Sequence, residues 1–313
     1  MMPKISVIIP THNRPHLLPR AIESARLAGS DIEVIVVDDA SVDETAAVCR
    51  GIRKIKHVRL VRNQGTAGAR NVGLMFSEAE FVCFLDDDDL RLPGSLDAQR
   101  ELLLDNAQAA FACGAISVAD QNYQPIGEVV APQHPSGDVF WPIMELDFPV
   151  IGLSSLIRKE SLLRVGLLRR HLSGIDDWDM FARLAEIFPA VVTQEAIGVY
   201  RQPTRHSRQG SSARAAQLRR AVRHQMELLQ LPRAASAPKK QRTQVRRSLR
   251  NRVADTLLWN AAQRLPYGEF DQVTENVWLA MQLNPARALR LRGTRKIRDA
   301  FAAKRRTAIS KQA

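Results

Sequence analysis

Four consecutive aspartates, Asp86, Asp87, Asp88 and Asp89, follow the apolar run "FVCFL". Like charges in a row repel one another, so a folded chain places them either on a solvated loop or around a cation. On an extended segment, Asp86 and Asp88 point to one side and Asp87 and Asp89 to the other. Carboxylates two residues apart can share Mg²⁺ or Mn²⁺, because both ions prefer oxygen ligands. The run therefore indicates a divalent-cation site, with a solvated acidic loop as the alternative.

The segments around these aspartates alternate between strand-like and helix-like patterns. Near-continuous, β-branched apolar runs predict buried parallel strands over 5–10, 32–39, 57–61 and 80–87. Helices are predicted between them, over 17–27, 43–51 and 67–76. This alternation predicts right-handed βαβ units in an open, mostly parallel α/β sheet flanked by helices. Ligands of such sheets bind outside the carboxyl ends of the strands, where Asp38, Asp39 and the four-aspartate run all lie.

The pattern is less regular after residue 93. A helix is predicted over 94–106 and another over 177–187, with strands, some of them antiparallel, over 111–119, 139–144, 150–158 and 190–201. Helical segments rich in Arg, Ala and Gln follow, with a linker-like stretch at 231–244. Residues 259–285 resemble a single tetratricopeptide unit, a helix pair around a Gly-containing turn, although disorder is the alternative. The expected organisation is a domain over 1–210 and a basic α-helical extension over 211–313.

Charge is distributed unevenly along the 313 residues. Residues 1–200 contain 19 Lys and Arg against 27 Asp and Glu, whereas residues 201–313 contain 26 against 6. The chain is therefore an acidic body with a strongly basic tail, and the tail predicts an anionic partner, either a membrane surface, a nucleic acid or a phosphorylated substrate. The tail has no interleaved aromatics, helix-turn-helix spacing or zinc ligands, so no specific nucleic-acid readout is expected.

Cysteine usage and hydropathy bear on where the protein resides. Cys49, Cys83 and Cys113 lack zinc-like spacing and lie in or beside apolar stretches, which is typical of reduced core thiols in a cytosolic protein. No stretch approaches the roughly 18 apolar residues of a membrane span. The N-terminal apolar run is too short for a signal peptide and has no small-residue cleavage site, so it is read as a buried strand.

Five segments contain the residues that could do chemistry, namely "SVIIPTHNRPHLL", "VIVVDDASVDET", "NQGTAGARNVG", "FLDDDDLRLPGSL" and "GIDDWDMFARL". Their order and spacing resemble those of the family 2 glycosyltransferases. The resemblance covers roughly residues 3–205. It implies the GT-A fold and a metal-dependent, inverting enzyme of the hexosyltransferase type that uses a nucleotide-diphosphate sugar, with UDP as the expected nucleotide and Mn²⁺ or Mg²⁺ as the cation.

The resemblance also implies residues that bind the donor. Asp39 would accept a hydrogen bond from the base, and Asp88 would be the metal ligand of the family's D-x-D motif, with Asp86 facing the ribose or the metal. Other nucleotide-sugar contacts would come from Pro10, Thr11, Gly68, Arg70 and Asp87. The glycines of "GTAGARN" match neither a Walker A nor a dinucleotide-binding motif, so a tight loop that starts a helix is the alternative for Gly68.

Inversion requires a base on the far side of the anomeric carbon, and in the family's motif this base matches Asp177. The neighbouring Asp176, Trp178 and Asp179 would contact the acceptor. Capping of a helix N-terminus is the alternative for the two aspartates, and a core position the alternative for Trp178. "GLLRR" at 166–170 departs from the Gly-Phe-Asp-Glu that often precedes this motif, which leaves the acceptor contacts in question.

A basic segment after the last predicted strand matches a stretch that folds over the diphosphate in the family. By that match His206 would be a further metal ligand, and Arg201, Arg205 or Arg208 would be a partner of phosphate oxygens. A flexible basic loop is the alternative.

The sequence thus predicts transfer of a sugar to a glycan or lipid-linked acceptor, with bacterial surface polysaccharide synthesis as the setting by family analogy. The basic tail would hold the enzyme peripherally at the cytoplasmic face of the membrane. One alternative is a non-enzymatic scaffold that binds nucleic acid or membrane through its tail, but it leaves the acidic clusters unexplained. Another is a nucleotidyltransferase, which "PTHNRP" after the first strand argues against.

Overall fold

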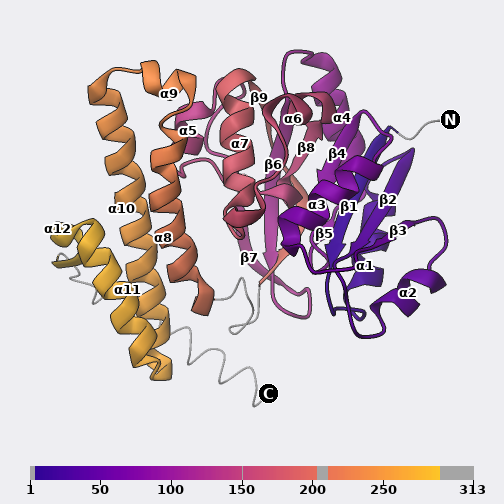
Figure 1. Ribbon diagram of the computed structural model, residues 1–313, viewed down its shortest axis with the longest axis horizontal. Helices are drawn as coiled ribbons and strands as arrows, with labels where there is room; N and C mark the ends of the chain where they lie inside the picture. Colours follow the sequence, from indigo (N-terminus) through magenta and orange to yellow (C-terminus); the bar gives the residue numbers. More distant parts are fainter. Residues whose placement is uncertain (1–3, 150, 203–210, 290–313) are drawn as a thin grey trace. The chain divides into compact units, whose positions relative to one another are not determined.

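The computed structural model describes residues 4–149, 151–202 and 211–289. The chain divides into two compact units. The sheet unit comprises residues 1–143 and 147–202, and the helical unit comprises residues 144–146 and 203–313. The order of elements can be followed in Figure 1.

One sheet forms the centre of the sheet unit, with its strands in the order β3-β2-β1-β4-β8-β6-β9-β5 and β7 paired to β6. The four strands predicted from β-branched apolar runs lie side by side and parallel, namely β1 (Ile5–Thr11), β2 (Ile32–Asp38), β3 (Lys56–Arg59) and β4 (Phe81–Phe84). All residues of β1 and β4 are buried, as expected for strands covered on both faces. Pro10 is tolerated within β1 because it lies next to the strand's end.

The second half of the sheet mixes directions, as the sequence predicted. β6 (Phe111–Ala119) runs parallel to β9 (Ala190–Arg201) and antiparallel to β8 (Ser155–Arg158) and to β7 (Pro125–Val130). The two-residue β5 (Leu90–Arg91) pairs antiparallel with β9. β5 and β7 were not predicted, because one is too short for a pattern and the other is exposed along nearly its whole length.

Helices cover both faces of the sheet. α1 (Leu18–Leu27), α2 (Thr45–Gly51) and α4 (Ser95–Asp105) share one apolar core with Val7 and Val36. α3 (Gly65–Phe76) lies on the other face, where a Cβ on Gly73 would come within 2.3 Å of Ile8. α7 (Asp176–Ile187) stacks Phe181 on Phe111 of β6 at 5.1 Å, and α6 (Lys159–Val165) packs beside it.

Two apolar segments differ from their predictions. Residues 139–144 were predicted as a strand, but they contain the short helix α5 (Phe140–Met144). Phe140, Ile143 and Met144 are buried at helical spacing, which a six-residue apolar run cannot distinguish from a strand. In 150–158, the strand begins only at Ser155, after a 3₁₀ turn over Gly152–Ser154. The three cysteines are free and buried, as predicted.

The helical unit contains α8 (Ser211–Leu228), α9 (Pro232–Ser236), α10 (Lys239–Arg264), α11 (Phe270–Leu283) and α12 (Pro285–Leu289). The linker prediction for 231–244 was wrong, because this stretch holds α9 and the first turns of α10. Pro232 occupies the first turn of α9 and Pro238 precedes α10, and both positions accept proline.

α10 and α11 form the expected helix pair. A 3₁₀ turn over Leu265–Tyr267 and a left-handed Gly268 connect them, and Asn284 donates to Asn251 Oδ1 at 2.7 Å. Within the described parts of both units, no helix combines the length and apolar character needed to cross a membrane.

Candidate active site

Most of the predicted site residues meet at the carboxyl ends of the parallel strands. Thr11 ends β1 opposite Asp38, which ends β2, and the aspartate run follows β4 on the other side of β1. Adjacent parallel strands bring their ends to one sheet edge, so residues far apart in sequence become neighbours there.

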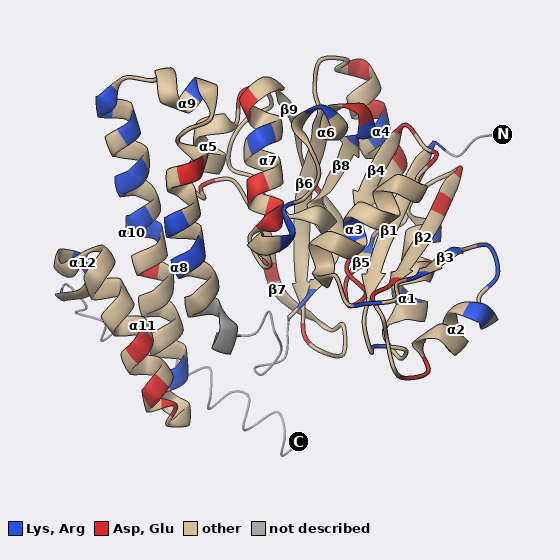
Figure 2. Ribbon diagram, in the orientation of Figure 1, with Lys and Arg blue, Asp and Glu red and all other residues tan. Residues whose placement is uncertain are grey.

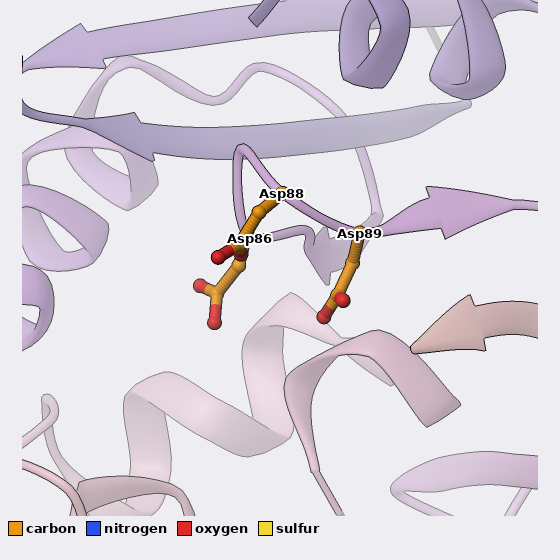
Figure 3. A group of neighbouring side chains, drawn as sticks. All are labelled: Asp86, Asp88 and Asp89. Carbon is orange, nitrogen blue, oxygen red and sulfur yellow. The ribbon is translucent and has the colours of Figure 1, made fainter. Parts of the chain in front are cut away.

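The aspartate run forms a turn, which we call the aspartate turn (residues 86–89). The Asp89 N–H donates to the Asp86 carbonyl at 3.1 Å. Oxygens of Asp86, Asp88 and Asp89 consequently lie within 4.8 Å of one another, and Figure 3 shows the three carboxylates. The predicted alternation of sides was wrong for Asp89, because a turn does not alternate its side chains as a strand does.

These three carboxylates suit a hard divalent cation. They offer only oxygen ligands, the kind that Mg²⁺ and Mn²⁺ prefer. Burial, and then the negative charges of their neighbours in the turn, raise the pKa of Asp88 and the pKa of Asp89. A bound cation would oppose both effects by favouring the ionised carboxylates.

Asp87 points elsewhere. Its carboxylate accepts from the Thr11 hydroxyl at 2.7 Å and from Arg14 at 2.9 Å, and Arg14 also reaches Asp88 at 2.8 Å. Burial raises the pKa of Asp87 to about 7, although the charge of Arg14 acts in the opposite direction. In this structure Thr11 and Asp87, both predicted to contact the nucleotide sugar, are bonded to each other.

Arg70, on α3, joins two acidic clusters. One guanidinium nitrogen donates to Asp86 at 2.8 Å, and the other contacts Asp177 and, at 3.3 Å, Asp176. The side chain is only 5% exposed. Burial alone would lower the pKa of Arg70. The charges of Asp177, Asp86 and Asp176 outweigh burial and raise the pKa above its ordinary value, so the guanidinium stays charged. The side chain points toward these carboxylates. Its predicted contact with the nucleotide remains a prediction.

The first turn of α7 supplies the second cluster. Asp177 accepts the Gly152 N–H at 3.0 Å through Oδ2 and contacts Arg70 through Oδ1, and its side chain is 21% exposed. Asp176 is buried and accepts the Gly174 N–H at 3.1 Å. Burial and the adjacent charge of Asp177 raise the pKa of Asp176. Of the two carboxylates, Asp177 is the one that presents surface to an incoming molecule.

Trp178 and Asp179 do not present an acceptor surface, contrary to their predicted roles. Trp178 is buried, and its indole N–H donates to the Ile143 carbonyl at 2.7 Å. Asp179 has no exposed surface and binds Arg183 at 2.8 and 2.9 Å and Arg169 at 3.3 Å. Both side chains are buried on α7. Trp178 fits its alternative, a core position, whereas Asp179 forms a buried ion pair and not the helix cap that was its alternative.

Asp39 lies at the start of α3. Its two carboxylate oxygens accept the backbone N–H groups of Gln64 at 2.6 Å and Gly65 at 2.9 Å. Negative charge at this position is favourable, because the N-terminus of a helix carries partial positive charge. Pro10 is buried in β1. A Cβ on Gly68 would come within 2.5 Å of the Gln64 side chain, which explains the need for glycine in the first turn of α3.

Several residues of the site were not predicted. Arg14, Asp89 and Gly152 contact predicted residues directly, and Tyr123 donates to the Asp88 carbonyl at 3.1 Å. Arg14 lies inside a quoted motif and could have been proposed as a partner for the acidic run, whereas Tyr123 comes from a hairpin without a motif. His206, Arg205 and Arg208 lie outside the described residues.

Comparison with known proteins identifies the domain. Residues 6–159 match the model of the family described as "Glycosyl transferase family 2". This part of the chain belongs to glycosyl transferase family 2. Four of the five sequence segments lie within this match, and the predicted resemblance to the family is confirmed.

Named relatives of this family 2 domain are bacterial. An uncharacterized glycosyltransferase of Haemophilus influenzae is 27% identical, over 58% of this chain and 62% of that protein. The GalNAc(5)-diNAcBac-PP-undecaprenol beta-1,3-glucosyltransferase of Campylobacter jejuni is 43% identical, over 36% of this chain and 37% of its own. The UDP-Glc:alpha-D-GlcNAc-diphosphoundecaprenol beta-1,3-glucosyltransferase WfgD of Escherichia coli is 31% identical, over 41% of this chain and 51% of that protein. The chain therefore spans less than two thirds of the length of each of these relatives.

Two solved structures share the fold of this chain. S. aureus TarS 1–349 in complex with UDP-GlcNAc superposes with a TM-score of 0.63 at 19% identity, over 95% of this chain and 89% of that one. Mannosyltransferase PcManGT from Pyrobaculum calidifontis, in complex with GDP-Man and Mn²⁺, superposes with a TM-score of 0.60 at 18% identity, over 96% of this chain and 84% of that one. The predicted fold, a mostly parallel GT-A sheet followed by C-terminal helices, is confirmed.

Proposed function

We propose that this protein is an inverting glycosyltransferase that moves a sugar from a UDP-sugar to a glycan or lipid-linked acceptor in bacterial surface polysaccharide synthesis. One observation carries the proposal: a buried arginine, Arg70, joins the aspartate turn to the partly exposed carboxylate of Asp177. Donor activation and acceptor deprotonation must occur within a few ångströms of each other, and this arrangement brings suitable groups for both together.

We assign the donor to the carboxyl ends of β1 and β2 and to the adjacent start of α3. Asp39 already accepts two backbone N–H groups, yet each carboxylate oxygen retains a lone pair for the N–H of a base. The names of WfgD and of the TarS complex mention UDP-Glc and UDP-GlcNAc, which favours UDP, whereas the PcManGT complex contains GDP-Man.

We assign a divalent cation to Asp86, Asp88 and Asp89. When bound, Mn²⁺ or Mg²⁺ would neutralise negative charge that builds on the departing diphosphate. The chain's own cations prepare this site, since Arg14 orients Asp88 and Arg70 orients Asp86. Without these arginines, the four aspartates would repel one another and the donor.

We assign the role of general base to Asp177. Its Oδ2 is held by the Gly152 N–H and its Oδ1 by Arg70, so both oxygens of the carboxylate are fixed in orientation. The start of α7 adds partial positive charge at the same place. The carboxylate would take the proton of the acceptor hydroxyl while that oxygen attacks the anomeric carbon from the side opposite the diphosphate, which inverts the configuration.

The helical unit would bring the enzyme to a lipid-linked acceptor. Residues 239–252 contain seven Lys and Arg and no Asp or Glu, and Figure 2 shows the basic residues gathered along the N-terminal half of α10. Anionic lipids at the cytoplasmic face of a membrane attract such clusters. The C. jejuni and E. coli relatives are named for undecaprenol-linked acceptors, which supports a peripheral membrane location.

A transfer assay tests the proposal. Nucleotide sugars would first be screened by thermal shift with and without Mn²⁺, and the stabilising donor would then be incubated with undecaprenyl-diphosphate sugars. We expect transfer with inversion in the wild type. Asp177→Asn should bind donor normally but turn over at least roughly a hundredfold more slowly, the scale of general-base loss. Near-normal turnover in that variant would exclude Asp177 as the base, and loss of donor binding would place α7 in the donor site instead.

A further inference from the structure

The tip of the hairpin between β6 and β7 lies against the aspartate turn. Tyr123, at this tip, donates through its hydroxyl to the Asp88 carbonyl at 3.1 Å. Residues 120–124 form a tight loop in which the Asp120 carboxylate accepts the N–H groups of Asn122 and Gln124, each at 2.8 Å. The loop is thus folded by its own hydrogen bonds, independently of the contact with Asp88.

Tyr123 adopts an unfavourable backbone conformation at this position. Its φ is +63°, in the left-handed region that favours glycine or asparagine over an aromatic residue. Nothing in the loop itself requires a tyrosine there, so the contacts of the side chain must compensate for the strain. Those contacts point toward the aspartate turn.

Two arginines contact the tyrosine ring, Arg20 from α1 and Arg201 from the end of β9. The guanidinium of Arg20 lies 4.6 Å from the ring centroid and that of Arg201 lies 5.5 Å from it, within the range of cation–π attraction. Arg201 is also bound to the hairpin, because its Nε donates to the Gln121 carbonyl at 2.8 Å. At the same time the Arg201 backbone N–H donates to the Asp89 carboxylate at 2.9 Å.

The hairpin tip therefore reaches two of the three candidate cation ligands. It contacts Asp88 directly through the tyrosine hydroxyl, and it contacts Asp89 through Arg201, whose side chain the tip holds and whose N–H orients the carboxylate. A turn that carries four like charges tends to open when no cation is present. Fixing its backbone and one of its carboxylates from outside would keep the ligands preorganised.

We propose that Tyr123 is a positioning residue that clamps the aspartate turn in the geometry that binds a divalent cation. This proposal rests on the proposed function of the turn as a cation site. It assigns a role to the β6–β7 hairpin, which contributes no group to the proposed chemistry. It also separates the two functions of Tyr123, since the hydroxyl acts on Asp88 and the ring acts on Arg201.

Titration of the full-length protein with Mn²⁺ in an isothermal calorimeter tests the clamp. Tyr123→Phe keeps the ring and removes the hydroxyl, and we expect its Mn²⁺ dissociation constant to rise about threefold to tenfold, as for one lost hydrogen bond, while the melting temperature falls by no more than a few degrees. Tyr123→Ala also frees Arg201, so its effect should be larger. The matched control is Gln121→Ala on the same loop, which keeps the backbone carbonyl and should bind Mn²⁺ as the wild type does.

A kinetic readout separates positioning from damage to the fold. Activity at saturating Mn²⁺ should approach the wild-type kcat in Tyr123→Phe, while the Mn²⁺ concentration for half-maximal activity rises. If Tyr123→Phe binds Mn²⁺ as tightly as the wild type and Tyr123→Ala behaves like Gln121→Ala, the clamp is excluded and the cation site stands. If the wild type itself binds no divalent cation, the cation site and the clamp are both overturned.

Discussion

Arg70 donates a 2.8 Å hydrogen bond to Asp86 and, through the other nitrogen of its guanidinium, contacts Asp177. A planar guanidinium can bridge two carboxylates in this way, whereas the ammonium of lysine is a single point charge. The proposed donor side and the proposed base are therefore coupled through one buried cation, and a change on one side alters the field at the other.

We predict that Arg70→Lys lowers turnover roughly tenfold to a hundredfold, a part of what loss of the base itself would cost. Arg70→Gln removes the charge as well. Without that charge, Asp86 and Asp177 both lose their shared buried cationic partner, so turnover should fall further than in Arg70→Lys. Wild-type turnover in Arg70→Gln would show that Arg70 does not act on the base.

We predict that donor binding depends on a divalent cation. Calorimetry of UDP binding should give an affinity at least about tenfold weaker in EDTA than in Mn²⁺, because the aspartate turn would otherwise repel the diphosphate. Asp88→Asn should remove most of the gain from Mn²⁺. Glu128→Gln, an exposed acidic position on β7, serves as the control and should retain it. Identical UDP affinities in EDTA and Mn²⁺ would contradict the cation assignment.

The structure also predicts a large loss of stability for Asp179→Asn. Arg183, the partner of Asp179, is buried and donates to the carbonyls of Val165, Gly166 and Leu167. Removing one charge of a buried pair leaves the other uncompensated and costs about 3–5 kcal/mol of unfolding free energy. Glu160→Gln breaks an exposed pair with Arg164 on α6 and should cost less than about 0.5 kcal/mol. Urea denaturation of the two variants measures the contrast, and similar losses would refute it.

A pH dependence follows from Asp87, whose pKa burial raises to about 7 from an ordinary value of 3.8. A carboxyl whose pKa is higher in the folded than in the unfolded state favours folding when protonated. Its contribution is present below pH 4 and is lost as the pH rises toward 7. In EDTA, the difference in unfolding free energy between wild type and Asp87→Asn should therefore change across this window, with the wild type losing stability relative to the variant. A constant difference between pH 4 and 7 would show that Asp87 is not perturbed.

β1, β2 and β4 could be predicted because each is a near-continuous apolar run, as expected of a strand that is covered on both faces. The 139–144 segment could not, since six apolar residues satisfy a strand and a short helix equally. The linker prediction failed because proline and basic residues suggest a break, although proline also begins helices and Lys, Arg and Gln are good helix formers.

The residues of the candidate site also divide into those that the sequence could predict and those that it could not. Asp86, Asp88 and Asp177 could be singled out from their motifs, but side-chain direction depends on contacts distant in sequence. Asp89 joins Asp86 and Asp88 because of one backbone hydrogen bond within the turn. Asp179 carried a local signal that would have corrected its assignment, since Arg183 lies four residues later on the same helix face. No local signal identifies Tyr123, because its partners come from α1, β9 and the aspartate turn.

The last prediction concerns the N-terminal half of α10. Val245 and Leu249 are buried there, while Lys239, Lys240, Arg246 and Arg247 are exposed. An electrostatic attachment should weaken steeply as salt screens these charges. We expect the full-length protein to co-sediment with vesicles containing phosphatidylglycerol at low salt and to dissociate as NaCl approaches 0.5 M, whereas neutral vesicles should not retain it. Arg246→Glu with Arg247→Glu should abolish most of the binding without changing sugar transfer to a water-soluble acceptor.

The matched control, Arg50→Glu with Arg53→Glu, makes the same charge change at exposed positions in and just after α2 and should leave vesicle binding intact. Equal losses in the two double variants would mean that only net charge matters, and tighter binding to nucleic acid than to vesicles would favour the scaffold alternative.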